Sequence, residues 1–151
     1  MAFASLLCGF QTEKPAVLAS GDHESGAKVE LLSVKREAPE APTVVTMRWR
    51  YRNEGDQPER LTKLRTGSID AYRLLVDTYL LDEVSKTKFP ITRDSENHPV
   101  GSRNGMPNEY IVIKPKTTVN AWGKYFIPEN VSKVTVAIDG VEPFSNIAIT
   151  K

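Results

Sequence analysis

The sequence is poor in the residues that build cross-links and metal sites, with one cysteine and two histidines among 151 residues. One thiol cannot form an intrachain disulfide, and three such side chains are too few for a zinc site built from them alone. The net charge is only +1, from 20 Lys and Arg against 19 Asp and Glu. This balance excludes the broad positive field that attracts nucleic acid or acidic membranes. We therefore expect no resident metal, no cofactor and no nucleic-acid partner.

Long apolar runs and catalytic motifs are also absent. No run approaches the ~20 apolar residues of a membrane-spanning helix, so we expect no transmembrane segment. There is no Gly-x-Ser-x-Gly element and no glycine-rich phosphate loop, and Ser, His and Asp do not form a recognisable catalytic arrangement. We therefore expect that the protein is not an enzyme. Both histidines, His23 and His98, are predicted to be exposed to solvent.

The first 26 residues differ in composition from the rest of the chain. Residues 1–10 are almost wholly apolar, like the core of a secretory signal, but no Lys or Arg precedes Lys14. They are either a truncated export segment or not a signal. Cys8 is then a lipidated residue, an idle remnant of targeting, or part of an apolar segment that docks on the domain. Residues 13–26 resemble a linker, so we expect residues 1–26 to be poorly ordered or only loosely packed on one domain at 27–151.

The strongest secondary-structure signal is an alternation of apolar and polar side chains at residues 43–52. A period of two predicts a half-buried strand of an antiparallel sheet. The apolar positions are Val45, Met47, Trp49 and Tyr51, and the polar positions are Thr46, Arg48, Arg50 and Arg52. We expect Trp49 in the core, because an inward-facing Trp is more often core than a ligand platform.

Further strands are predicted along the rest of the domain. Residues 29–34 change phase midway, which suggests a bulge or a switch between sheets. Residues 109–113, 117–126, 133–138 and 144–149 are also predicted strands, and residues 114–116 are predicted to form a turn between two neighbouring strands. Residues 68–84 fit both a helix and a hairpin. We favour a short helical turn at 69–74 and strands near 76–82 and 87–92, with Pro90 at an edge or a bulge. About seven to nine short strands separated by turn residues predict an all-β sandwich or a small barrel.

Five segments resemble a known group of domains. They are MRWRYRNEG (47–55), YLLD (79–82), FPITRD (89–94), AWGKYFIP (121–128) and VTVAIDGVEPF (134–144). Through them the chain resembles immunoglobulin-like β-sandwich domains of bacterial exported and cell-envelope proteins, some of which are lipoproteins or stand beside OmpA-like peptidoglycan-binding domains. The resemblance implies an immunoglobulin-like antiparallel β-sandwich outside the cytoplasm, either secreted or in the periplasm or cell envelope. It transfers no catalytic residue.

Three arginines form a first candidate contact surface. Arg48, Arg50 and Arg52 share one strand face, where like charges repel unless acidic side chains on neighbouring strands compensate. They are either a solvated face with interleaved acids or a docking stripe for an acidic partner or an anionic envelope polymer. Lys63 and Arg65 would join the stripe if their segment lies alongside.

A second candidate surface lies in the strand predicted at 117–126. Trp122 and Phe126 have the opposite phase to residues 119, 121, 125 and 127, so one set faces outward unless a bulge intervenes at Gly123. An outward Trp122 and Phe126 would form an aromatic contact surface. Asn53–Asp56 and Asp94–Asn97 carry oxygen ligands but lack the spacing of a calcium loop, so we predict turns at both places.

Three functions agree with these features. The favoured one is a non-catalytic binding module of the bacterial cell envelope or exterior, whose partner is a protein or an envelope polymer. The second is a structural or accessory subunit that pairs through an edge strand, for example as a homodimer. The third is an enzyme whose site is assembled from residues scattered in the sequence.

Overall fold

The computed structural model describes residues 16–62, 71–105 and 110–151, and the segment predicted as a strand at 43–52 lies at its centre as β3 (Ala41–Arg52). Val45, Met47, Trp49 and Tyr51 point inward and expose at most 1% of their surface. Arg48 is exposed on the opposite side, and Arg50 and Arg52 are half-buried there. Period two therefore identified both the strand and its buried face, and the core position of Trp49 is confirmed.

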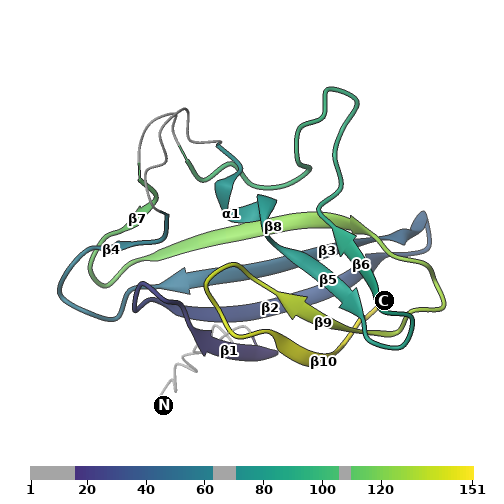
Figure 1. Ribbon diagram of the computed structural model, residues 1–151, viewed down its shortest axis with the longest axis horizontal. Coiled ribbons are helices and arrows are strands. Elements are labelled where there is room, and N and C mark those ends of the chain that lie inside the picture. The colour runs from purple at the N-terminus through teal and green to yellow at the C-terminus, as the bar shows by residue number, and fades with distance from the viewer. Residues whose placement is uncertain (1–15, 63–70, 106–109) are drawn as a thin grey trace, which may run out of the picture.

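Three antiparallel sheets organise the described residues (Figure 1). The long sheet has the strand order β1 (Ala19–Asp22), β2 (Lys28–Glu37), β3 and β8 (Thr118–Phe126). The short sheet has the order β10 (Phe144–Ala148), β9 (Lys133–Ala137), β5 (Tyr79–Asp82) and β6 (Thr87–Pro90). A small third sheet pairs β4 (Glu59–Arg60) with β7 (Val112–Ile113), and one helical turn, α1 (Arg73–Val76), precedes β5.

The long and short sheets enclose one hydrophobic core. Leu31, Trp49 and Tyr125 from the long sheet belong to the same buried cluster as Leu80 and Val136 from the short sheet. Figure 1 shows the short sheet lying in front of the long sheet. The expected all-β class is confirmed. The described residues form ten strands rather than seven to nine, because β1 and β4 arise in segments where the sequence did not indicate strands.

The phase change in β2 is a bulge, one of the two alternatives that the sequence left open. The register between β2 and β3 shifts between Leu31 and Ser33. Because the bulge inserts one residue, Val34 returns to the side of Val29 and Leu31, and all three are buried. Beyond the bulge Lys35 therefore points outward, and Arg36 points toward the interior.

The linker expected at 13–26 is wrong for residues 19–26. Residues 19–22 form β1, which pairs with β2 from Ala19 opposite Leu31 to Asp22 opposite Lys28. The sheet thus starts before residue 27, the expected domain boundary. Residues 1–15, including Cys8, lie outside the described residues, so the export segment stays a prediction.

His23 is buried, with 6% exposure, which contradicts the expected solvent position. It lies in the β1–β2 turn, which packs against the β9–β10 turn through a hydrogen bond from the Glu24 N–H to the Gly140 carbonyl (2.9 Å). A Cβ on Gly140 would come within 2.5 Å of His23 Nε2, so the close approach of the two turns needs glycine there. Burial lowers the pKa of His23. This contact between the turns joins the two sheets at one end.

A buried arginine joins the sheets at the other end. Arg36 exposes 8% of its surface and donates hydrogen bonds to four backbone carbonyls. The acceptors are Pro42 (2.8 Å), Ile127 (2.9 Å), Pro128 (2.7 Å) and Val131 (2.5 Å). The side chain thereby fastens the segment between β8 and β9 to the β2–β3 hairpin.

The ambiguous segment at 68–84 contains the short helix and then the hairpin that we favoured. Helix α1 covers Arg73–Val76, and residues 69 and 70 of the expected turn lie outside the described residues. β5 and β6 follow as an antiparallel pair. Pro90 ends β6, an edge strand of the short sheet, as predicted. The turn at 114–116 does not join paired strands, because β7 pairs with β4 and β8 pairs with β3. The described part of the chain contains no helix with the length and apolar character needed to cross a bilayer.

Candidate binding face

The outward side chains of β2, β3 and β8 form rows across the long sheet. Residues directly opposite each other in antiparallel strands point to the same side, so the register defines the rows. They are Lys28–Arg52–Thr118, Glu30–Arg50–Asn120, Ser33–Arg48–Trp122, Lys35–Thr46–Lys124 and Val44–Phe126. Together with Glu37 at the end of β2, we call this surface the outer face.

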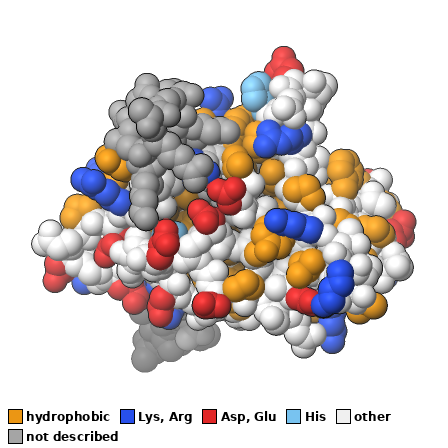
Figure 2. Space-filling view, viewed as in Figure 1, with side chains coloured by type: hydrophobic (Ala, Val, Ile, Leu, Met, Phe, Trp, Pro, Cys, Tyr) orange, Lys and Arg blue, Asp and Glu red, His pale blue; other side chains and the backbone are white. Residues whose placement is uncertain are grey.

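The outer face is basic although the whole chain is nearly neutral. It carries six Lys and Arg side chains against two carboxylates, Glu30 and Glu37, and two more carboxylates at its border, Asp22 and Glu54, pair with Lys28 and Arg52. Figure 2 shows the other side of the molecule, over the short sheet, where acidic side chains gather toward the lower left and basic and apolar side chains lie on the right. The charge of +1 therefore conceals a separation of charge between surfaces.

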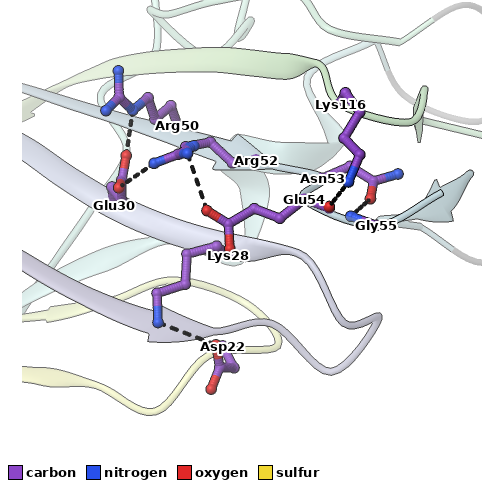
Figure 3. A network of polar contacts seen from close by, with 9 residues as sticks. All are labelled: Asp22, Lys28, Glu30, Arg50, Arg52, Asn53, Glu54, Gly55 and Lys116. Atoms are coloured by element: carbon purple, nitrogen blue, oxygen red, sulfur yellow. Dashed lines mark hydrogen bonds and ion pairs between the residues drawn. The ribbon is translucent and has the colours of Figure 1, made fainter. Parts of the chain in front are cut away.

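Glu30 compensates two of the three arginines of the predicted stripe (Figure 3). Its nearly buried carboxylate accepts hydrogen bonds from Arg50 Nε and from Arg52 Nη1, the latter at 3.0 Å. Arg52 also contacts Glu54 through Nη2 (3.0 Å). Burial alone would raise the pKa of Glu30, but the hydrogen bonds and charges of the two arginines outweigh burial and lower it. At this end of the arginine stripe, Glu30 is therefore the interleaved acid of the solvated-face alternative.

Glu37 compensates a cation near the other end of the outer face. Lys124 Nζ lies 2.7 Å from its carboxylate, and the Thr46 hydroxyl donates a hydrogen bond to the same oxygen (2.8 Å). These contacts lower the pKa of Glu37. The acid therefore bridges β2, β3 and β8 on the surface of the sheet.

Arg48 and Lys35 remain as exposed cations between these two acidic positions. Neither forms an ion pair with any residue in the described ranges. Both line a groove of about 400 Å³ at the β2–β3 hairpin, together with Ser33, Arg36, Glu37, Ala38, Glu40, Ala41 and Thr46. The sequence analysis identified Arg48 but missed Lys35 and the groove, because the bulge in β2 decides which side Lys35 faces.

Aromatic rings border the two exposed cations on β8. Ala121, Gly123, Tyr125 and Ile127 are buried, so the alternative set at 122 and 126 faces outward. Trp122 is half-buried directly opposite Arg48, and Phe126 is 60% exposed opposite Val44. No bulge interrupts the register between β3 and β8 at Gly123. The predicted aromatic surface therefore lies on the same face as the arginine stripe, whereas Lys63 and Arg65 lie outside the described residues.

Two other places hold groups that could bind a ligand. Ligand atoms of Asp94, Glu96 and His98, all exposed, lie within 4.8 Å of one another and could hold a metal ion. The Asp94 carboxylate also accepts hydrogen bonds from two N–H groups of its own turn, at Glu96 and His98, which agrees with the predicted turn. Elsewhere, Val84 is 95% exposed and lines grooves of about 310 Å³ and 250 Å³ beside the β5–β6 turn.

A serine and a histidine also meet, at the β1–β2 turn. The Ser25 hydroxyl lies 2.8 Å from His23 Nδ1, a distance suited to activation of a nucleophile. The backbone N–H of Ser25 donates to the same nitrogen at 3.0 Å, so the lone pair of Nδ1 is already engaged by the turn. The pair is best explained as part of the turn that buries His23.

Most sheet edges are occupied or irregular. Beside β8, the N–H groups of Thr92 and Ser102 donate to the β8 carbonyls of Lys124 and Trp122. β6 ends in Pro90, and β10 contains a register shift between Phe144 and Ile147. Among the described strands of the two four-stranded sheets, β1 is therefore the edge strand left for regular pairing with another chain, which is the alternative function.

Comparison of the chain with models of known protein families, with curated proteins and with solved structures found no match. Its class is therefore defined by the fold alone, as two stacked four-stranded antiparallel sheets with a basic, aromatic outer face.

Proposed function

We propose that the chain is a non-catalytic binding module that holds an anionic partner on the outer face of the long sheet. The observation that carries this proposal is the pair of exposed cations, Arg48 and Lys35, without a carboxylate partner among the described residues, beside a groove of about 400 Å³. A surface with uncompensated cations attracts an anionic partner and orients it during association.

The proposed location is the bacterial cell envelope or exterior. The apolar residues 1–10 and the resemblance to immunoglobulin-like domains of exported proteins support this location. The outer face suits a partner found there, because envelope polymers and surface proteins are often anionic. Expression of the protein with its natural start in a bacterial host, followed by fractionation, tests the location. Recovery from the cytoplasm alone would contradict it.

Loss of capture by a double variant tests the function. Lys35→Ser with Arg48→Ser removes the two exposed cations and leaves the Glu30 network intact. Immobilised wild-type protein should retain components of an envelope extract that the double variant loses. Lys86→Ser with Lys133→Ser is the matched control, because it removes two exposed cations from the short-sheet side. Equal capture by all three proteins would refute the assignment of the outer face.

A further inference from the structure

The outer face combines charge with exposed rings, and this combination restricts the partner more than charge alone. Trp122, Lys124 and Phe126 are successive outward positions of β8. At about 3.4 Å per residue, the two aromatic residues lie roughly 13–14 Å apart. The strip that they border includes Arg48, opposite Trp122, and continues into the groove at the hairpin. This exposed strip is thus long enough to hold an extended ligand along β8.

The surrounding polar groups are suited to hydroxyl-rich ligands. Ser33 stands in the row of Arg48 and Trp122, and Thr46 stands in the row of Lys35. Asn120 is the outward position of β8 next to Trp122, in the neighbouring row. Hydroxyl and amide groups exchange hydrogen bonds with sugar hydroxyls. The apolar faces of sugar rings stack on aromatic rings, and a guanidinium binds carboxylates in a bidentate manner.

The sheet backbone disfavours a peptide as the occupant. β3 is a central strand whose N–H and C=O groups pair with β2 and β8. A peptide lying on this face would find few backbone partners for its own N–H and C=O groups, and unpaired buried amides are costly. A polysaccharide backbone has no peptide N–H and C=O groups that need such partners. A lipid surface is also disfavoured, because among the described residues of this face Phe126 alone is a strongly exposed large apolar side chain.

We propose that the outer face binds an anionic polysaccharide, with sugar rings against Trp122 and Phe126 and carboxylates against Arg48 and Lys35. This inference rests on the proposed function and specifies its partner. The polymer runs along β8 and its acidic groups reach across β3 toward the groove. Glu37 and Glu30, which are engaged by their own cations, do not neutralise the two exposed charges.

Tryptophan fluorescence provides a direct test, because the chain has two tryptophans and Trp49 is fully buried. The full chain is titrated with oligomers of polygalacturonate and of hyaluronan at low salt. Binding should change the emission of Trp122, and the affinity should fall as salt is raised. Fully methyl-esterified polygalacturonate, which keeps the rings and loses the charge, should bind at least ten-fold more weakly. Polyglutamate, which keeps the charge and lacks the rings, should also bind at least ten-fold more weakly.

Variants separate the two parts of the site by calorimetry. Lys35→Ser with Arg48→Ser should weaken polygalacturonate binding about ten-fold, and Lys86→Ser with Lys133→Ser should leave it unchanged. Trp122→Phe should keep most of the affinity but lose the fluorescence change, whereas Trp122→Ala should lose five-fold or more. Circular dichroism checks that each variant is folded.

The outcomes distinguish this inference from the proposed function. No binding of either polysaccharide, or equal binding of polyglutamate or anionic vesicles, overturns the polysaccharide assignment. If capture from the envelope extract still depends on Lys35 and Arg48, the proposed function stands without it. If neither experiment depends on these two residues, both proposals are refuted.

Discussion

Replacing Arg36 by Met should lower the free energy of unfolding by about 3 kcal/mol. The side chain donates to four carbonyls, and its bonds to Ile127 and Val131 are buried. Water can replace the donor at the two partly buried carbonyls of Pro42 and Pro128. Each of the two buried carbonyls would be left without a donor, which costs about 1–3 kcal/mol. Part of this cost is offset, because the Met variant no longer has to desolvate a buried cation.

Urea and thermal unfolding measure this effect. At roughly 2–4 °C per kcal/mol for a chain of this length, Tm should fall by about 6–12 °C. Arg36→Lys should recover less than half of the loss, because one ammonium cannot reproduce the planar arrangement of donors. Arg48→Met is the matched control on the same sheet, and since Arg48 is exposed it should change stability by at most about 0.5 kcal/mol.

The reasoning would be refuted by an Arg36→Met variant as stable as the control. Full recovery by Arg36→Lys would also contradict it, because the three donors of a compact ammonium would then replace the planar guanidinium. A large change in the urea m-value would indicate an altered unfolded state rather than loss of the carbonyl contacts.

Two further predictions concern the long sheet. Glu30 has a lowered pKa in the folded protein, so its contribution to stability is present above the ordinary carboxyl pKa of about 4.3 and is lost as pH falls through the lowered value. The stability difference between wild type and Glu30→Gln, about 1–2 kcal/mol at pH 7, should therefore shrink below pH ~4.3 in urea titrations, and a difference independent of pH would contradict the ion network. Gly101→Ala should cost about 1–3 kcal/mol in thermal unfolding, because a Cβ would lie 2.4 Å from the Trp122 carbonyl oxygen. Gly55→Ala is the control, because a Cβ there would lie 3.4 Å from its nearest neighbour, an ordinary contact distance. A loss of stability in Gly55→Ala as large as that in Gly101→Ala would contradict the steric explanation.

Local patterns were sufficient to predict most strands. The alternation in β3 predicted which of its side chains face the core. The phase change in β2 indicated only an irregularity, and the opposed sets on β8 left open which set faces outward. The turn residues of 19–26 did not indicate a strand, because β1 has two exposed and two half-buried residues and no apolar alternation. Its pairing with β2 and the packing of the turn against Gly140 create the burial of His23.

The candidate site was predictable only in part. The sequence placed Arg48, Arg50 and Arg52 on one face and paired Trp122 with Phe126. It could not show that these sets share one surface, because strand order brings β8 beside β3 across more than sixty residues of chain. It also could not distinguish the arginines from one another, since the register decides that Glu30 lies opposite Arg50 rather than Arg48.

The sequence alone therefore determined the β class and the inward face of β3, because period two is a property of neighbouring residues. Tertiary structure decided which charges are compensated. The numbers of cysteines and histidines and the net charge describe the chain as a whole, whereas electrostatic interactions depend on the distances between charges in space. Arg36 finds three of its four carbonyls 91 to 95 residues away, and Arg48 finds no acid among the described residues. Both outcomes follow from strand order and register, which no local pattern specifies.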